Sequence, residues 1–499
     1  MKQSYQLIAP LLLLTVACSV QQDEIHLGQG IMAGEITETS VILQTRLTAS
    51  DTLVQDDLPG KEGWVAFELD TSVNFDSPMR TEVMEAVADH DYIVKEKVTG
   101  LQPNTTYRYR VFYGPGPGQL NVGPAGTFRT LAGREISAPV SFVVVTGMNY
   151  YHFHYGNYNR DLAYSGPDKA LGYPALEAIA NLNPDYFIGT GDNVYFDHPD
   201  SVNFDRALRA GNHPSPGRFD GKAATDEEGI RKKYHVQFCQ PRYRTLFSRL
   251  GTYWEKDDHD YRCNDADPYI AYPVSHELGI SSFREQLPVT DPGDPSALTY
   301  RTHRLNRDVQ LWFLEGRDYR SPNNMEPGPE KTLLGAAQIA WLKETLLASD
   351  ATFKLIISPT PMVGPDDLYK TDNHVNPGGF RNEGEALFAW FADQGFLSKG
   401  LYIICGDRHW KYHATHPSGF EEFSTGALVD NNSRAGRLAG DPESTDPDGL
   451  IVQHFIEGTP EEASGGFLLV TVERESGVPT ATFRFFEEHG KLLYEVKKH

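Results

Sequence analysis

PDYFIGTGDNVYFD (residues 184–197) is an apolar run that ends in Gly191-Asp192, a pattern typical of a buried strand followed by a turn. A carboxylate at the carboxyl end of a strand faces the cleft in which α/β sheets bind ligands, and it can bridge two hard cations. We therefore interpret Asp192 as a metal ligand. A turn without any metal would explain Gly-Asp equally well, so the interpretation depends on further ligands at other strand ends.

Tyr195 follows Asp192 by three residues and is the second candidate ligand. A free phenol has a pKa of about 10, so its phenolate binds well only to a strong Lewis acid such as ferric iron. The pair therefore predicts a metal site that includes an iron ion.

Residues 254–260, WEKDDHD, place a histidine between acidic residues after a second apolar run. A carboxylate at Asp258 could bind one cation, while His259 could act as a hydrogen-bond donor to the substrate or as the acid for a leaving group. A run of surface acids is the alternative explanation.

Residues 401–409, LYIICGDRH, form a third apolar run with ligand-type residues at its end. If the strand continued, Asp407 and His409 would project on the same side and could bind one ion or a bridged pair. A histidine with a purely structural role is the alternative.

A fourth strand end lies in residues 314–320, LEGRDYR. Its Arg317 or Arg320 could clamp an anionic oxygen with two parallel hydrogen bonds. An ion pair with Glu315 or Asp318 would explain the arginines without any substrate.

The 499-residue chain has a formal net charge of −23, with 39% hydrophobic and 23% charged residues. This composition is ordinary for a globular protein of two or three domains. So acidic a chain argues against a nucleic-acid groove as the main function, and we expect no stable nucleic-acid partner.

The N-terminus is typical of a secretion signal. Lys2 precedes an apolar run, residues 7–17, that is too short to cross a membrane. The run ends in LLLLTVAC, which is similar to a bacterial lipoprotein signal cleaved before a lipidated cysteine, here Cys18. We predict a signal peptide over residues 1–18 and a chain exported to the periplasm or cell surface, with a lipid as its membrane anchor. Thr15 departs from the pattern, and ordinary signal cleavage is the alternative.

Two domains follow in the sequence. Residues 24–132 alternate short β patterns with Gly, Pro and Asn turns, which predicts a β-sandwich, and LQPNTTY (residues 101–107) resembles the corner of a fibronectin type III domain. Residues 136–499 alternate buried strands with helical patterns, which predicts an α/β domain. The antiparallel β pattern after residue 465 is expected to complete its second sheet.

Taken together, the motifs resemble one family. GDNVY, DDHD, EGRDYR, LGAAQIAWL and GDRH occur in the order found in the alkaline phosphatase D (PhoD-like) branch of the calcineurin-like metallophosphoesterases, and GEITETSVILQTR in the N-terminal domain also matches that branch. Purple acid phosphatases share a sandwich followed by GDxxY, but they carry Asn-His-Glu and Gly-His-x-His at the later positions. The resemblance implies a fibronectin type III-like β-sandwich followed by a four-layered α/β/β/α metallophosphoesterase domain.

The resemblance also implies roles for individual residues. Members of this family are expected to use ferric iron (Fe³⁺) with calcium (Ca²⁺) in a dinuclear or multinuclear site, where a metal-bound hydroxide attacks phosphorus. Arg317 or Arg320 and His259 would then stabilise the phosphoryl oxygens and the leaving group. The implied metal ligands are Asp192, Tyr195, Asp258, Asp407 and His409.

The chain departs from the family at its first α/β strand. The family has Ser-Cys there, with the Cys as an iron ligand, whereas this chain has Thr146-Gly147. Asn149, His152 or His154 could substitute as harder ligands, which would shift the preference toward calcium, Zn²⁺ or Mn²⁺. Alternatively these residues line a substrate pocket together with the aromatic side chains among them, Tyr150, Tyr151, Phe153 and Tyr155. The remaining candidate metal or substrate residues are Asn264 and His374.

The sequence therefore predicts an exported phosphoric ester hydrolase that cleaves phosphomonoesters or phosphodiesters of small molecules or polymers at neutral to alkaline pH. One alternative is a hydrolase of the same fold that acts on another ester, such as a sulfated glycan, because metal-assisted attack does not distinguish phosphorus from sulfur. Another is a non-catalytic surface binding protein.

Overall fold

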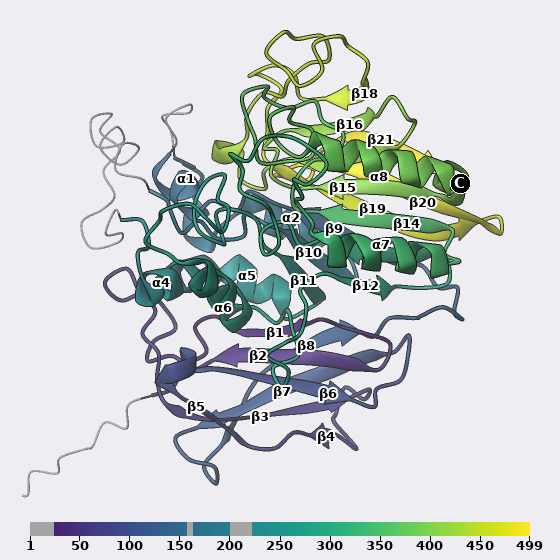
Figure 1. Cartoon of the computed structure of the whole chain (residues 1–499). Helices are drawn as coiled ribbons and strands as arrows, with labels where there is room; N and C mark the ends of the chain where they lie inside the picture. Colours follow the sequence, from purple (N-terminus) through teal and green to yellow (C-terminus); the bar gives the residue numbers. More distant parts are fainter. Residues whose placement is uncertain (1–23, 157–162, 200–221) are drawn as a thin grey trace, which may run out of the picture.

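The computed structural model describes residues 24–156, 163–199 and 222–499, in which three β-sheets are flanked by helices (Figure 1). The signal peptide predicted over residues 1–18, with Cys18, lies outside the described residues. Within the described ranges, no helix has the length and apolar character needed to cross a membrane.

The N-terminal β-sandwich occupies the lower part of Figure 1. One of its sheets contains β3 (Gly63–Asp70), β4 (Met79–Arg80), β5 (Met84–Ala86), β7 (Thr106–Gly114) and β8 (Asn121–Arg129). The facing strands are β1 (Ile31–Gly34), β2 (Ser40–Arg46) and β6 (Ile93–Thr99). The Gln102 amide donates to Tyr107 Oη at 2.9 Å, which is the contact expected at a tyrosine corner.

The sandwich shares a sheet with the α/β domain. β1 pairs in parallel with β11 (Gly251–Glu255), so that Ala33 lies opposite Gly251 and Gly34 opposite Thr252. The resulting nine-stranded sheet has the order β21-β20-β19-β9-β10-β11-β1-β2-β6. Because the backbone hydrogen bonds continue from one domain into the other, the sandwich is held firmly against the sheet that carries most of the candidate site.

The α/β part of this sheet is built from β9 (Val140–Val145), β10 (Tyr186–Thr190) and β11, which run in parallel. Side chains alternate along β9: Phe142 and Val144 face the inner core, while Val143 and Val145 face the outer helices. These helices are α2 (Pro174–Leu182), α4 (Glu227–Phe238) and α5 (Pro241–Phe247).

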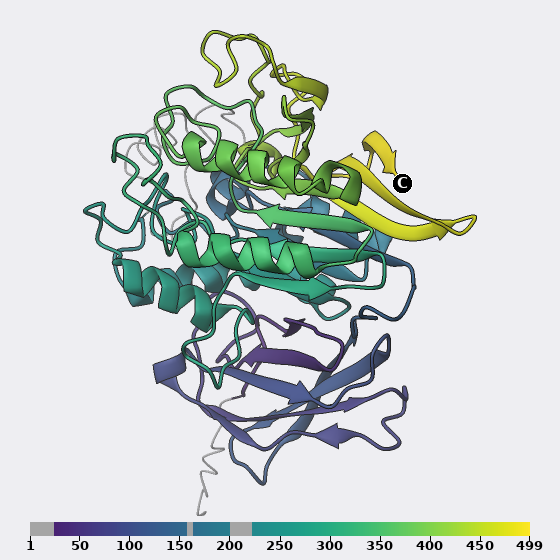
Figure 2. The ribbon, with the colours of Figure 1, turned by 45° about the vertical axis from the view of Figure 1, so that its right-hand side comes forward.

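The second α/β sheet has the order β12-β13-β14-β15-β17-β16-β18. Its strands are β12 (Arg301–Arg304), β13 (Val309–Phe313), β14 (Phe353–Ser358), β15 (Leu401–Cys405), β16 (Lys411–Thr415), β17 (Glu421–Thr425) and β18 (Val452–Ile456). Helices α7 (Ala336–Ala348) and α8 (Arg381–Asp393) lie across its outer face (Figure 2).

The two sheets face each other across one apolar core. Val144 and Ile188 of the first sheet share this core with Leu355 and Ile357 of the second, while Ile356 points to the outer helices. The order of layers is therefore helix, sheet, sheet, helix, and the predicted α/β/β/α architecture is confirmed.

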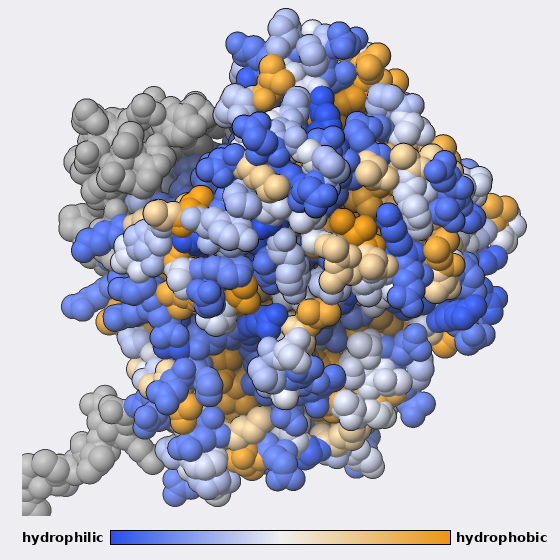
Figure 3. Space-filling view, in the orientation of Figure 1, coloured by the Kyte–Doolittle hydropathy of each residue, from blue (hydrophilic) through white to orange (hydrophobic). Residues whose placement is uncertain are grey.

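The C-terminal strands join a different sheet from the one expected. β19 (Gly466–Glu475) pairs antiparallel with β9, and β20 (Val478–Glu487) and β21 (Leu492–Lys498) follow outward from it. They complete the first sheet and not the second, because β9 would otherwise be an edge strand with unpaired backbone groups. On the face shown in Figure 3, apolar residues form small groups separated by polar and charged ones.

Candidate metal centre

The candidate site lies where the ends of β10, β11 and β15 approach one another. A Cβ atom at Gly406 would lie only 2.4 Å from Thr190 O, so glycine allows the two inner sheets to meet here. Asp192 and Asp407, each directly after a strand-end glycine, have φ angles of 53° and 58°. Asp adopts this left-handed conformation more readily than most residues, and such backbone is common at functional sites.

Asp192 is the centre of one set of contacts. Tyr195 Oη donates to Asp192 Oδ2 at 2.8 Å, and His409 Nε2 lies 3.1 Å from the same oxygen. Tyr195 Oη and His409 Nε2 are 3.3 Å apart. Asp192 Oδ1 is buried and accepts no hydrogen bond within the part of the chain that the structure describes. The structure thus brings these three predicted ligands together around an oxygen that lacks a partner.

The electrostatics of this set suit a cation. Burial raises the pKa of Asp192 to about 7, and the charges of Asp258 and Asp407 add to this shift. Burial and the nearby charge of Arg434 lower the pKa of His409 to about 3, so its imidazole is neutral. Neutral imidazole is the form that binds metals, and a cation between these groups would relieve the buried carboxylate.

Asp258 and His259 lie next to this set. Asp192, Asp258 and His259 each offer one atom, and these atoms lie within 4.8 Å of one another. Asp258 Oδ2 accepts from the Asp265 amide at 2.6 Å. The nearby charges of His259 and Arg317 hold the pKa of Asp258 below its usual value despite burial.

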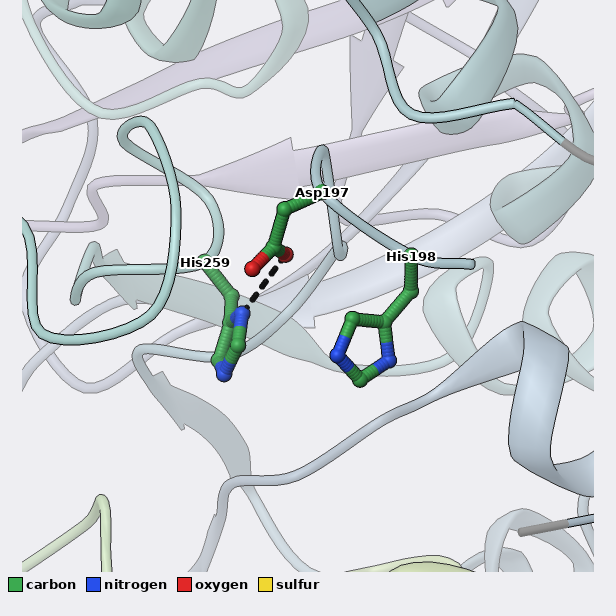
Figure 4. Close-up of side chains that lie close together, drawn as sticks. All are labelled: Asp197, His198 and His259. Atoms are coloured by element: carbon green, nitrogen blue, oxygen red, sulfur yellow. Dashed lines mark hydrogen bonds and ion pairs between the residues drawn. The ribbon is translucent and has the colours of Figure 1, made fainter. Parts of the chain in front are cut away.

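His259 is paired with an acid that the sequence interpretation did not assign. His259 Nδ1 lies 2.7 Å from Asp197 Oδ1, and the other ring nitrogen points away from Asp197 (Figure 4). Asp197 and His259 also form a possible ligand group with His198. Burial alone would lower the pKa of His259, but the charges of Asp197, Asp258 and Asp192 raise it well above its ordinary value. The imidazole therefore carries a proton in the absence of metal.

Asp260 fixes the backbone that carries these ligands. Its Oδ1 accepts from the Asp257 amide at 2.7 Å and from the Asp192 amide at 3.3 Å. Its Oδ2 accepts from the backbone and side-chain nitrogens of Asn193, at 3.1 and 2.5 Å. One buried carboxylate thus joins the ends of β10 and β11.

A second acidic group lies on the other side of Asp258. One oxygen from each of Asp258, Asp265 and Asp372 falls within the same 4.8 Å limit. Lys370 Nζ lies 2.5 Å from Asp265 Oδ1, and Arg317 Nη2 lies 3.7 Å from Asp372 Oδ2. Basic side chains therefore already compensate part of this negative charge.

Arg317 and Arg320, the predicted anion clamp, are fully buried. Arg317 Nε and Nη2 both contact Asp257 Oδ1, at 2.7 and 2.6 Å. Arg320 donates to Gly316 O at 2.6 Å and to Asn323 Oδ1 at 3.2 Å. These contacts support a role in holding the strand ends.

Glu315 and Asp318, the alternative ion-pair partners expected for the two arginines, pair with Lys256 instead. Lys256 Nζ lies 2.6 Å from Glu315 and 2.5 Å from Asp318, and all three side chains are buried. A sequence motif could not show that a lysine from a neighbouring strand end would occupy these acids.

Asp407 and His409 are not arranged by strand alternation as predicted. β15 ends at Cys405, and the left-handed turn at Asp407 directs the two side chains to different partners. His409 contacts Asp192, whereas Asp407 is bound by Arg408.

The place of the family cysteine is filled. Gly147 has a φ of 66°, and a Cβ atom there would lie 2.8 Å from Ala427 Cβ and 3.2 Å from Asn432 Nδ2. Asn432 Nδ2 donates to Tyr195 Oη at 2.8 Å and to Gly147 O at 3.1 Å, and its Oδ1 lies 2.8 Å from His152 Nδ1. Asn432 therefore takes over this corner of the site, and no sequence motif had marked it.

His152 and His154 lie in a short helix, α1 (Tyr150–Tyr155). Asn149 caps this helix by accepting from the His152 amide at 2.9 Å. Phe153 stacks on Tyr164 in the core. The aromatic residues predicted to line a substrate pocket thus belong partly to the interior.

The remaining candidates, Asn264 and His374, are not members of the three ligand groups found among the described residues. Asn264 is exposed, and its backbone amide donates to Asp197 Oδ2 at 2.9 Å. His374 is buried, with Nε2 2.9 Å from Glu383 Oε1. In its segment it is Asp372, two residues earlier, that joins the acidic group.

The donor set fits metal ions. It includes buried carboxylates and the neutral imidazole of His409. One oxygen of Asp192 lacks a hydrogen-bond partner in the described ranges. Two of the candidate ligand groups share Asp258, and two share His259. Such oxygen and nitrogen donors suit hard or borderline cations. The arrangement could hold more than one ion.

Comparison with known proteins gives a consistent result. The chain matches the PhoD-like phosphatase family over residues 142–455 and the N-terminal domain of PhoD-like phosphatases over residues 15–132. Alkaline phosphatase D of Bacillus subtilis (strain 168) is 22% identical over 373 residues, which is 69% of this chain and 59% of that protein. The aligned part therefore spans less than two thirds of the relative's length.

Two solved structures show the same fold. A structure of PhoD has a TM-score of 0.69 at 18% identity, covering 94% of this chain and 88% of the other. A purple acid phosphatase from yellow lupin (Lupinus luteus) seeds has a TM-score of 0.56 at 10% identity, covering 94% and 73%. The sandwich followed by the α/β/β/α domain is thus shared with both proteins.

Proposed function

Because the chain belongs to the PhoD-like phosphatase family, we propose that it is a metal-dependent phosphoric ester hydrolase acting on phosphomonoesters or phosphodiesters. One observation carries the proposal: Asp192, Asp258 and His259 converge at the strand ends, with Asp197 directly behind His259. This arrangement combines metal ligands with a proton donor at one place.

In this proposal two sets of residues hold the ions. Asp192, Tyr195 and His409 would hold one ion, and Asp258 and Asp407 would hold the other. When bound, the ions supply the Lewis acidity that activates water and withdraws charge from phosphoryl oxygens. The donor set supports Ca²⁺ on the carboxylate side and Fe³⁺ beside Tyr195, with Zn²⁺ or Mn²⁺ as alternatives because no thiolate replaces the family cysteine at Gly147.

His259 serves the leaving group. Asp197 accepts the hydrogen bond of Nδ1, which leaves the Nε2 proton free to point away from Asp197. As the bond between phosphorus and the ester oxygen breaks, this proton passes to the departing oxygen and the imidazole becomes neutral. A retained Nδ1 proton and the charge of Asp197 then favour its reprotonation.

Metal analysis and a panel of substrates test the proposal. We expect the purified protein to contain metal and to hydrolyse 4-nitrophenyl phosphate or its bis ester at neutral to alkaline pH, and to lose this activity with a chelator. Hydrolysis of sulfate esters alone would favour the alternative of a sulfated glycan substrate. Metal binding without hydrolysis of any ester would favour a surface binding protein.

The visible spectrum tests the assignment of Tyr195. A charge-transfer band that disappears in Tyr195→Phe would support ferric iron at this residue. A colourless protein with calcium, zinc or manganese only would exclude it.

Export is a separate part of the proposal. We propose that cleavage before Cys18 and lipidation of this residue anchor the protein at the periplasmic or outer cell surface. Fractionation and mass spectrometry of the mature protein test this, because Cys18→Ala should release the chain from the membrane fraction.

A further inference from the structure

The two arginines predicted to clamp the anion, and Arg408 next to Asp407, are unavailable to a substrate. Arg317, Arg320 and Arg408 expose 0 to 1% of their surface. Arg317 is engaged by Asp257, and Arg408 by Asp407 and Asp366. An arginine binds phosphoryl oxygens by direct hydrogen bonds. If an arginine binds the substrate at the metal centre, it must therefore be a different one.

Arg434 lies beside the site and is open to solvent. Its backbone amide donates to His409 O at 2.9 Å, which fixes it next to a predicted ligand. Its side chain is 36% exposed, and its guanidinium lies over the ring of Trp410, 4.5 Å from the ring centre. The ring supports one face of the guanidinium, so that the planar group is held with its edges available for hydrogen bonds.

The loop before Arg434 is anchored on Tyr195 and Gly147. Asn432, two residues earlier, donates to Tyr195 Oη at 2.8 Å and to Gly147 O at 3.1 Å. The segment from Asn432 to Arg434 is therefore held at both ends, by Tyr195 at Asn432 and by His409 at Arg434. This anchoring places Arg434 reproducibly relative to the metal ligands.

The charge of Arg434 is only partly compensated. Arg434 Nη1 lies 3.0 Å from Asp367 Oδ2, but the other oxygen of Asp367 lies 2.5 Å from Arg437 Nε. Arg437 has two more partners, Asp441 and Glu443. Within the described ranges Asp367 is the one carboxylate that forms an ion pair with Arg434. Arg434 and Arg437 thus share Asp367, and of the two only Arg437 forms ion pairs with other carboxylates in the described ranges.

We propose that Arg434 binds the nonbridging oxygens of the substrate phosphoryl group, as the arginine clamp of the site. This inference rests on the proposed function and names the residue that recognises the anion. A guanidinium with an exposed edge and a shared counter-ion binds an incoming dianion without first losing a complete ion pair. Arg434 then contributes mainly to binding, and the metal ligands contribute mainly to the chemical step.

Arg434→Gln and Arg437→Gln form a matched pair of variants. Both remove one guanidinium from Asp367, but only the first lies beside His409. In Arg434→Gln we expect KM for 4-nitrophenyl phosphate and the inhibition constant of inorganic phosphate to rise about 10- to 100-fold, as for loss of a charge-assisted hydrogen bond. Arg434→Lys should recover part of the loss, and Arg437→Gln should change either value less than about threefold.

Metal content and thermal unfolding of each variant show that the centre and the fold are intact. Equal effects of the two glutamine variants would overturn the proposal, as would a fall in kcat at unchanged KM and unchanged phosphate inhibition in Arg434→Gln. Stronger inhibition by inorganic sulfate than by phosphate in the unmodified protein would overturn the assignment to a phosphoryl group. If that protein hydrolyses no phosphate ester, the proposed function fails, and calorimetric binding of phosphate to the metal-loaded variants still tests Arg434.

Discussion

The two Gly-Asp turns of the site, Gly191-Asp192 after β10 and Gly406-Asp407 after β15, have the same local conformation. Both aspartates are buried and have a φ between 50° and 60°. Each follows a glycine at the end of a parallel strand whose neighbours lie in the same sheet. From the sequence and the backbone the two positions are equivalent.

Their surroundings are opposite. The partners of Asp192 Oδ2 are a phenol and a neutral imidazole, and burial raises the pKa of this aspartate to about 7. Asp407 is bound by Arg408, and the charges of Arg408 and Lys370 lower its pKa despite burial. The charge of Asp192 is therefore not compensated by an ion pair with the chain, whereas the charge of Asp407 is partly compensated by Arg408 and Lys370. A local motif predicts where a carboxylate lies, but not which charges meet it.

Replacement of Asp192 should give the largest difference between the two turns. We expect Asp192→Asn to lower kcat/KM by about 1,000-fold or more, because loss of a bridging ligand removes the Lewis acid. Asp407→Asn should retain one ion per chain in metal analysis. Asp366→Asn is the control, since it removes a partner of Arg408 without removing a predicted ligand. Full activity and metal content in Asp192→Asn would contradict the comparison.

The metal-free protein should respond to pH through the same contrast. The folded-state pKa of Asp192 is about 7, above its unfolded value of about 4, so its contribution to stability is present below pH 4 and is lost as the pH rises to 7. The expected loss is on the order of 4 kcal/mol. Asp407 has a lowered pKa, so its contribution is present above pH 4 and is lost in acid.

Thermal unfolding in chelator between pH 4 and 8 measures this effect. Asp192→Asn should reduce the decline toward pH 8, to which Asp260 and Glu488 also contribute, and should unfold at a higher temperature than the unmodified apoprotein at that pH. An identical pH profile for both proteins would mean that Asp192 does not carry an uncompensated charge.

Asp197→Asn tests the proton donor next to the Asp192 turn. The variant removes a charge that raises the pKa of His259, so protonated His259 should be lost at lower pH and the alkaline limb of the rate profile should move to lower pH. We expect kcat to fall about 10- to 100-fold, as for other residues that orient a ligand or acid. A reduced kcat with an unmoved alkaline limb would assign Asp197 a structural role only.

Gly147→Cys should have the smallest effect on stability and activity. It tests the end of β9, where no aspartate follows the glycine. The new side chain would meet Ala427 and Asn432 in a left-handed backbone, so we expect a loss of about 1 kcal/mol in stability and no new iron band. Gly147→Cys with Ala427→Gly is the control for crowding. An iron-thiolate band in the single variant would show that the site accepts the family ligand.

Much of the fold could be predicted from the sequence because its elements depend on local periodicity. The apolar runs around residues 186–190 and 401–405 form the expected strands, and the apolar pattern before residue 348 forms α7. The destination of the C-terminal strands was predicted wrongly, because their pattern is compatible with either sheet and only the unpaired edge of β9 decides between them.

The site was predictable to the extent that its residues follow strand ends. Asp192, Asp258 and His259 meet as expected, and Asp197 was visible in the same motif. Asn432 and Arg434 were not predictable. Asn432 ends a short 3₁₀ helix and Arg434 follows it in a loop, and both owe their places to contacts with residues more than 20 positions away in the chain.

The sequence by itself determined that carboxylates and histidines would stand at the ends of buried strands, because strand periodicity and glycine turns are local properties. Only the tertiary structure decided which of them would be neutralised by the chain. Arg317 comes to lie against Asp257, and Arg408 contacts Asp366 as well as its sequence neighbour Asp407. Asp192 meets no arginine or lysine ion pair in the described ranges. Ion pairing depends on distances between residues remote in sequence, and these distances exist only after the two sheets have packed together.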